Sequence, residues 1–244
     1  MSTWIEGRNA VIEALRSGMP LRRVLIAQGV TGEAIAEIER LATRAQVRVE
    51  RTARARLDSV SDHGSHQGVA AEAASFAYAP LEAVLERVAD SPRSLLVALD
   101  QVTDPGNLGA VARCAEVAGA DAVIVPARRS ASVGSAAFKS SAGALAHLPL
   151  VQETNLVRAL KRLKEAGYWI AGADGSARTL AWDAELDGRL VLVMGAEGSG
   201  LSRLVRETCD FLVALPVAGR VDSLNVAQAT AVLAFEWVRR GRSE

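Results

Sequence analysis

The sequence predicts an α/β protein, with a parallel sheet in its C-terminal part and a small α/β module in front of it. Short apolar runs such as 190–194 alternate with stretches in which apolar residues recur at helical spacing. Several of these runs contain no polar residue, which is typical of strands buried on both faces of a parallel sheet. The 244 residues suffice for one large domain or two smaller ones with a real core.

Residues 1–76 are expected to form the small N-terminal module. Helical spacing and short apolar or alternating runs define its elements in order: helix 9–17, strand 23–27, helix 32–45, strand 47–50 and strand 68–72. A turn-rich segment, 61–67, leads into the last strand. After this module the sequence changes character.

Residues 77–93 are interpreted as a linker between two domains. They contain Pro80 and Pro92 on either side of one short predicted helix, 81–89. Residues 94–244 follow as the second domain, and their pattern is more regular.

The second domain is expected to alternate strands and helices. Apolar runs predict strands over 94–99, 122–125, 168–171, 189–194 and 211–214. Helical spacing predicts helices over 108–118, 155–166, 201–207 and 225–239. This alternation predicts a parallel sheet that helices cover on both faces.

Composition excludes several classes of protein. No apolar run is long enough to span a bilayer, and the N-terminus shows no signal-peptide pattern. The two cysteines, Cys114 and Cys209, favour neither a disulfide framework nor a zinc site, and His63, His66 and His147 are not spaced as metal ligands. We therefore expect a cytoplasmic protein with no membrane contact and no metal.

The charges balance, with 28 Lys and Arg against 28 Asp and Glu, so net charge alone indicates no nucleic-acid binding. Distribution is more informative, because the stretch 40–56 contains six arginines and a single acid, Glu50. Two interpretations of this stretch stay equally open: an RNA-facing surface and an ordinary solvated face.

A first polar motif follows the predicted strand 94–99. Asn107 is suited to cap the next helix, and Gly106 and Gly109 allow a ligand or another backbone to approach closely. Arg113 follows in the same helix, where we expect it within reach of the strand ends. Taken alone, this motif is better explained by a helix cap and a surface ion pair.

A second motif, Gly195-Ala-Glu-Gly-Ser-Gly200, follows strand 189–194. It lacks the lysine of a P-loop and the glycine spacing of a dinucleotide-binding loop. Because Glu197 would repel a phosphate, a cationic or neutral ligand suits this loop better.

A third motif follows strand 211–214. Leu215 and Pro216 come directly after the strand, and Ser223, Leu224 and Asn225 precede the final helix. The polar pair alone would be ordinary capping chemistry.

Together the three motifs resemble those of the SpoU family, the TrmH-like members of the SPOUT class of RNA ribose methyltransferases. They occur in order at family-like spacing, and segments 7–15 and 66–69 resemble the family's substrate-binding domain, so the resemblance covers nearly the whole chain. Both of these segments look closest to the RlmB-type enzymes. The resemblance implies an L30e-like N-terminal domain, a SPOUT domain with a C-terminal trefoil knot, and a homodimer with each site near the partner chain.

The resemblance also implies an activity, the S-adenosylmethionine-dependent 2′-O-methylation of a guanosine ribose in large-subunit (23S) ribosomal RNA. Two alternatives remain, the same chemistry on tRNA and a non-catalytic RNA-binding or ribosome assembly factor. The two-domain layout favours ribosomal RNA, and the joint presence of the motif side chains favours an enzyme.

Site residues follow from the same resemblance. The catalytic set is Arg113, Asn107, Glu197, Ser223 and Asn225. The cofactor set is Gly195, Leu215, Leu224, Met194, Ala173 and Gly200. An RNA-contacting set follows instead from position along the chain: Arg128 and Arg129 come after strand 122–125 on the ligand edge, Lys139 lies in the same region, and His66 precedes the Gln-Gly turn, with Arg8 completing the set. Since arginine is effectively always protonated, our hypothesis is that Arg113 grips a phosphate beside the target ribose and stabilises the forming alkoxide, while phosphate, Glu197 or water takes the proton.

Overall fold

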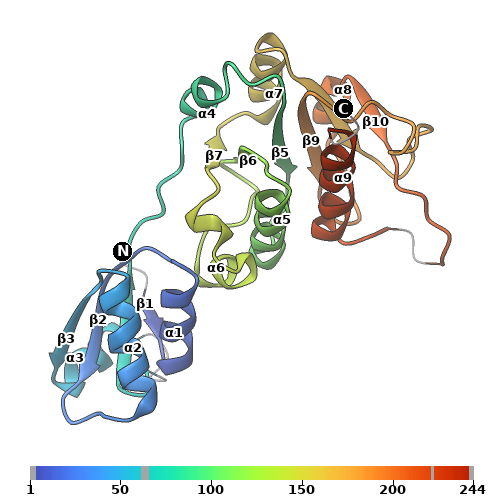
Figure 1. Cartoon of the computed structure of the whole chain (residues 1–244). Coiled ribbons are helices and arrows are strands. Elements are labelled where there is room, and N and C mark those ends of the chain that lie inside the picture. Colours follow the sequence, from blue (N-terminus) through green and yellow to red (C-terminus); the bar gives the residue numbers. More distant parts are fainter. Residues whose placement is uncertain (1–3, 62–65, 221–222, 242–244) are drawn as a thin grey trace.

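The computed structural model describes residues 4–61, 66–220 and 223–241, and these form two sheets with their covering helices (Figure 1). A four-stranded sheet belongs to the N-terminal module and a six-stranded sheet to the C-terminal part. The two α/β units predicted from the sequence are therefore both present. Part of the predicted turn 61–67 lies outside the described residues, as do His63 and Asp222.

The N-terminal module begins with a strand that the sequence pattern did not reveal. Its elements are β1 (Trp4–Glu6), α1 (Arg8–Arg16), β2 (Leu21–Ala27), α2 (Glu33–Arg44), β3 (Arg48–Thr52), α3 (Arg54–Val60) and β4 (Val69–Ala73). The sheet order is β1-β4-β2-β3, and only β2 and β3 run parallel. Alternating residues of β2 are buried on opposite faces of the sheet. Val24 and Ile26 belong to the main core cluster, whereas Leu25 belongs to a second cluster with Leu57 of α3.

The predicted linker is packed against the second domain. Its helix α4 (Leu81–Arg87) contributes Leu81 and Val84 to a core cluster of that domain. Ala79 forms a parallel bridge to Val151, so the chain before α4 covers the edge strand of the large sheet.

The C-terminal sheet is parallel throughout, in the order β10-β8-β9-β5-β6-β7. Its strands are β5 (Ser94–Asp100), β6 (Ala122–Pro126), β7 (Leu150–Glu153), β8 (Trp169–Ala173), β9 (Arg189–Gly195) and β10 (Phe211–Val213). Its helices are α5 (Pro105–Val117), α6 (Ser135–Ser141), α7 (Leu156–Glu165), α8 (Arg203–Thr208) and α9 (Val226–Arg240), with a short 3₁₀ turn η1 (Ala144–Ala146).

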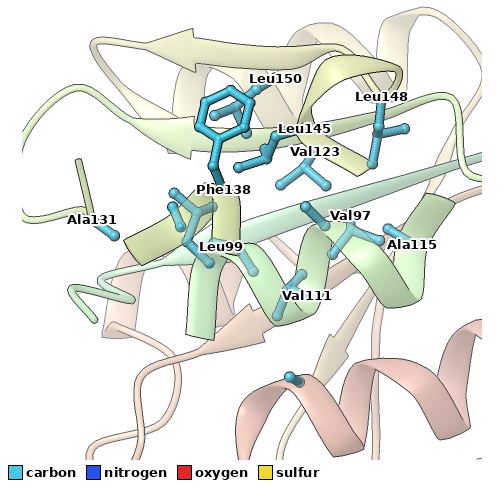
Figure 2. Packing of buried hydrophobic residues seen from close by; sticks show 14 of the residues in the cluster. Val97, Leu99, Val111, Ala115, Val123, Ala131, Phe138, Leu145, Leu148 and Leu150 are labelled. Atoms are coloured by element: carbon cyan, nitrogen blue, oxygen red, sulfur yellow. The ribbon is translucent and has the colours of Figure 1, made fainter. Parts of the chain in front are cut away.

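Burial on both faces explains the uninterrupted apolar strands. Along β5, Leu95, Val97 and Leu99 face one core cluster, and Leu96 and Ala98 face the other. The first cluster lies under α5, α6 and α9, and Figure 2 shows Phe138 of α6 packed with Leu145 and Leu150 there. The second cluster lies under α4, α7 and α8.

Capping residues correct three predicted helix starts. The predicted helix 108–118 begins at Pro105, because the Asp104 carboxylate caps it by accepting the Asn107 backbone N–H at 2.7 Å. Helix 201–207 begins only at Arg203, with Ser202 as its N-cap residue. Asn225 is likewise the N-cap of α9, so this helix begins at Val226.

The sequence pattern does not predict α3, α6 or β7, and the composition and length of these elements explain why. Helix α6 consists largely of Ala and Ser, which give no apolar period, and α3 buries only Leu57. Strand β7 has four residues, of which two are buried. Elements this short provide too few residues for a period to be recognised.

Candidate active site

The carboxyl ends of four neighbouring strands form the edge that carries the motifs. Registers place Val213 of β10 beside Ala173 of β8, and Gly195 of β9 beside Asp100 of β5. Ligands of open parallel sheets bind at this edge, outside the carboxyl ends of the strands. The candidate site therefore lies above these strand ends.

Three motif side chains meet there in a closed hydrogen-bonded cluster. Asn225 Nδ2 donates to Glu197 Oε1 at 2.6 Å and to Asn107 Oδ1 at 2.9 Å. Asn107 Nδ2 donates to the same Glu197 oxygen at 3.2 Å. One residue from each of the three motifs thus enters a single polar cluster, although they are up to 118 residues apart in sequence.

Helix starts hold the two asparagines in place. Asn107 lies in the first turn of α5, behind the Asp104 cap, and Asn225 caps α9 by accepting the Ala227 N–H at 2.9 Å. Since α5 and α9 pack on each other, their N-terminal ends lie close together at the strand edge. Helix packing therefore fixes the distance between the two side chains.

The glycine loop that carries Glu197 closes on itself. Ala196 and Gly200 exchange two backbone hydrogen bonds, at 2.8 and 3.2 Å, and Gly198 and Gly200 have positive φ. A Cβ on Gly195 would overlap the backbone of Gly200, so only glycine fits at the base of the loop. This geometry presents Glu197 above the strand ends.

The residues assigned to the cofactor lie around this loop. Ala173 and Gly195 end their strands, and Met194 is buried beneath them. Leu215 is partly buried directly after β10, whereas Leu224 is 48% exposed. The loop 195–202 carries an acid and no basic side chain, a donor set that suits a cationic ligand better than a phosphate.

Two catalytic candidates do not join the cluster in this chain. Arg113 is exposed and makes no hydrogen bond or ion pair with the described residues. It lies about 9 Å further along α5 than Asn107 and roughly 120° around the helix. Ser223 is exposed and has no described contact to the cluster either. The structure of the single chain therefore does not bring Arg113 into the cluster at the strand ends. A partner surface or a ligand would have to engage it there.

Cys114, next to Arg113, is only partly buried. Burial raises the pKa of its thiol, and the Arg113 charge opposes part of that rise.

Three of the basic residues expected to contact RNA are free to do so. Arg128 and Arg129 are exposed just after β6, and Lys139 is exposed on α6; none of them has an ion pair among the described residues. Arg8 instead contacts the neighbouring turn, its Nε donating to the Gln67 carbonyl at 3.3 Å.

His66 does not fit the role predicted for it. Its side chain is 1% exposed, with Nδ1 accepting the Gly68 N–H at 3.0 Å and Nε2 placed 2.9 Å from Asp58 Oδ1. Both ring nitrogens are engaged inside the module. The ring therefore supports the turn before β4 and is not open to RNA.

The arginine-rich stretch 40–56 divides into two groups. Arg40, Arg48 and Arg51 pair with Glu37, Glu50 and Glu39. Arg44, Arg54 and Arg56 are exposed and unpaired within the described chain. About half of the stretch thus behaves as an ordinary solvated face, and the other half offers free positive charge.

Sequence reasoning missed one polar residue at the site. Asp100 ends β5 with 4% exposure, and its Oδ2 accepts the Ser202 N–H at 2.6 Å. An acid at the end of an otherwise apolar strand was the available signal.

Cavities lie at the opposite edge of the large sheet. One of about 570 Å³ is lined by residues that include Pro92, Ala166 and Arg189, and one of about 320 Å³ includes Trp169 and Asp210. These residues stand at or before the amino ends of their strands and belong to none of the motifs. We locate the candidate site at the motif edge because its polar cluster is built from all three motifs.

Within residues 4–61, 66–220 and 223–241 no helix has the length and apolar character needed to cross a membrane. The same residues contain no group of three or more His, Cys, Asp or Glu side chains arranged to hold a metal.

Comparison with known proteins matches both parts of the chain. Residues 94–235 match the SpoU rRNA Methylase family, and residues 4–79 match the RNA 2′-O ribose methyltransferase substrate-binding domain. An uncharacterized tRNA/rRNA methyltransferase of Mycolicibacterium vanbaalenii is 41% identical over 97% of this chain and 76% of its own length. A putative TrmH family tRNA/rRNA methyltransferase of Staphylococcus aureus is 37% identical over 98% of this chain and 96% of its own.

A solved structure agrees with these relatives. The SpoU methyltransferase AviRb from Streptomyces viridochromogenes, solved in complex with AdoMet, has a TM-score of 0.73 and 25% identity, and the similarity covers 100% of this chain and 92% of that one. The three motifs, the fold and both family matches agree, and the chain belongs to the SpoU rRNA Methylase family.

Proposed function

We propose that this protein transfers the methyl group of S-adenosylmethionine to the ribose 2′-hydroxyl of a guanosine in 23S ribosomal RNA. The observation that carries the proposal is the Asn107–Glu197–Asn225 cluster, which joins the three family motifs at the strand edge. The match of the N-terminal module to an RNA substrate-binding domain supports an RNA substrate. The RlmB-like character of segments 7–15 and 66–69 supports the finer assignment to a ribosomal guanosine.

The chemistry of the site fits the cofactor. When bound, S-adenosylmethionine supplies an electrophilic methyl group on a positively charged sulfur. Glu197 brings negative charge to a loop without basic side chains, and Gly195 lets the base of the loop pack closely on Gly200. We assign the adenosyl contacts to the backbone of Gly195, Leu215 and Leu224, with Ala173, Met194 and Gly200 around them.

The protein's own residues then prepare the hydroxyl. Asn107 and Asn225 both donate to one Glu197 oxygen, which leaves the second oxygen without a described partner and available to accept a proton. Arg113 has no partner among the residues that the structure describes, so its guanidinium is free to bind an RNA phosphate and to stabilise the alkoxide as it forms. Ser223 lies close in sequence to Asn225 and completes the proposed set.

We also propose that the protein works as a homodimer and that Arg113 acts at the partner's site. Arg113 shares the open side of α5 with Val117, which is 62% exposed, and Phe235 on the adjoining α9 is 48% exposed. Exposed apolar side chains on the same two packed helices as an unpaired arginine suit an interface next to a site. Equilibrium sedimentation that finds only monomer at micromolar concentration would contradict this arrangement.

The trefoil knot remains a proposal that rests on the family resemblance. An experimental structure in which the chain leading into α9 threads no loop would contradict it.

Mapping of ribose methylation on total RNA, from cells with and without the protein, tests the substrate. We expect one 23S guanosine to lose its mark. A lost mark on tRNA, with ribosomal RNA unchanged, would favour the tRNA alternative. The absence of any S-adenosylmethionine binding by calorimetry would favour a non-catalytic RNA-binding or ribosome assembly factor.

Replacement of Arg113 by Lys tests the guanidinium. We expect turnover to fall about 100-fold, since lysine keeps the charge but loses the planar bidentate geometry. Cofactor affinity measured by calorimetry should not change. Near-wild-type turnover of Arg113→Lys would remove the specific guanidinium role.

A further inference from the structure

Asp100 is a nearly buried acid that the proposed reaction has not used. It is the last residue of β5, with 4% exposure. Its Oδ2 accepts the Ser202 N–H at 2.6 Å, and its other oxygen has no hydrogen-bond partner among the described residues. Burial of a carboxylate is costly unless its interactions compensate, so the position of this acid calls for an explanation.

The hydrogen bond reaches the exit of the glycine loop. Asp100 is paired in register with Gly195, where the loop begins, while its side chain holds Ser202, where the loop ends. One residue of β5 thus contacts both ends of the loop. Between these ends the Ala196–Gly200 bridge closes the loop upon itself.

The apex of the loop carries Glu197, whose position matters most for the cluster. Its Oε1 lies 2.6 Å from Asn225 Nδ2 and 3.2 Å from Asn107 Nδ2. The two asparagines are fixed by helix starts, whereas Glu197 depends on the loop. Rotation of the loop about its base would separate the carboxylate from both amides.

We infer that Asp100 is a positioning residue for methyl transfer, which holds the 195–202 loop through the Ser202 N–H so that Glu197 stays on Asn107 and Asn225. The role belongs to the hydrogen bond and not to the charge of the carboxylate. The inference rests on the proposed function for its catalytic consequence, but the effect on the loop stands independently of it.

Three variants separate this role from simple loss of stability. Asp100→Ala removes the acceptor, while Asp100→Asn keeps an amide oxygen that can accept the Ser202 N–H. Ser94→Ala is the matched control, because Ser94 begins the same strand, is 1% exposed and loses hydrogen bonds to Asp121 and Tyr168 at the opposite edge. All three are studied in the full chain, below their melting temperatures.

The first readout is hydrogen exchange of the amides in 196–202, without cofactor or RNA. We expect faster exchange in Asp100→Ala, and near-wild-type exchange in Asp100→Asn and Ser94→Ala. Unchanged exchange in Asp100→Ala would overturn the inference. This result does not depend on any activity, so it remains informative even if the wild-type protein binds no S-adenosylmethionine and the proposed function fails.

The second readout is kinetic. Because a displacement of about 1 Å can cost about 100-fold in rate, we expect kcat of Asp100→Ala to fall 10- to 100-fold, with KM for RNA nearly unchanged. Asp100→Asn should recover most of this loss, and Ser94→Ala should keep its kcat. An Asp100→Asn variant as slow as Asp100→Ala would overturn the inference by assigning the effect to charge. A loss of kcat in Ser94→Ala equal to that in Asp100→Ala would also overturn the inference, because the loss would then be explained by lower stability of the protein.

Discussion

Asn225 serves the fold and the site with different ends of one side chain. Its Oδ1 caps α9 by accepting the Ala227 N–H, and its Nδ2 donates to Glu197 and Asn107. Asp or Ser would cap the helix equally well, but Asp has no donor and Ser has a single O–H, whereas the amide combines an acceptor oxygen with two N–H donors. The need for both explains why an asparagine stands here.

Substitution of Asn225 separates the two tasks. Asn225→Asp keeps a good cap and should leave the melting temperature nearly unchanged, yet its carboxylate replaces a donor to Glu197 with like charge, so we expect turnover to fall at least 10-fold. Asn225→Ala should lose turnover and also about 1 kcal/mol of stability. Thermal melts and single-turnover methylation measure these effects.

Asn155 supplies the matched control for this pair. It caps α7 by accepting the Arg158 N–H at 3.0 Å, and it belongs to none of the motifs. Asn155→Ala should therefore lose similar stability with unchanged turnover. Full activity in Asn225→Asp would contradict a role for the Nδ2 donor.

Cys209 gives a pH-dependent prediction at the same scale. Burial raises the pKa of its thiol to about 11, so the folded protein holds the proton where an unfolded chain releases it. The resulting stabilisation is complete below the ordinary thiol pKa and is lost as the pH rises from about 9 to about 11. Wild type should accordingly lose more stability than Cys209→Ala across this window, as measured by urea denaturation. Parallel pH profiles of the two proteins would contradict the shift.

At the scale of elements, Gly109 controls how closely α6 approaches α5. A Cβ at this position would overlap Ser140 Oγ and the Ala137 carbonyl oxygen. One turn of α5 and one turn of α6 thus pack almost backbone to backbone, two residues away from Asn107. The sequence predicts that Gly109 allows a ligand or another backbone to approach closely. The structure shows that the backbone of α6 does so.

Gly109→Ala should therefore destabilise the protein, although alanine favours a helix interior by about 1 kcal/mol over glycine. We expect a net loss of about 2 kcal/mol in urea denaturation, because α6 must move to accept the methyl group. Gly175→Ala is the control, since a Cβ there meets open space at negative φ. Equal stability of the two variants would show that α6 yields without strain.

The helices and strands also show which parts of the structure the sequence predicts. Strands such as β5 and β9 were predicted because burial on both faces leaves an uninterrupted apolar run. The glycine loop, Asn107 and Asn225 were predicted because three motifs in order are specific. The Asp100–Ser202 hydrogen bond was not, since an acid at the end of an apolar strand does not reveal that its partner lies 102 residues away. Burial of His66 was missed for a different reason: its partner Asp58 lies on α3, which buries only Leu57 and so gives no apolar period.

At the scale of the whole molecule, the proposed function assigns RNA binding to the N-terminal module and chemistry to the C-terminal domain. The polar cluster lies entirely in the C-terminal domain, while Arg44, Arg54 and Arg56 offer unpaired positive charge on the described part of the N-terminal module. The modules touch where α1 meets α6, the helix that packs on α5. Helix α6 therefore connects the proposed RNA-binding module with the helix that carries Asn107.

Two double variants with the same change in net charge test which arginines contact RNA. Arg54 and Arg56 are exposed and unpaired within the described chain, whereas Arg16 and Arg40 both bind Glu37 and lower its pKa. Arg54→Ala/Arg56→Ala should weaken RNA binding and reduce the slope of log K against log salt by about 1.4, at about 0.7 for each phosphate contact to a single strand. Arg16→Ala/Arg40→Ala should change the slope little, because its charges are already neutralised inside the module. Titrations at several salt concentrations measure both slopes, and calorimetry should find unchanged S-adenosylmethionine affinity in each variant. Equal slopes for the two would mean that the unpaired arginines are an ordinary solvated face, and RNA contact would then have to be sought at Arg128, Arg129 and Lys139 of the catalytic domain.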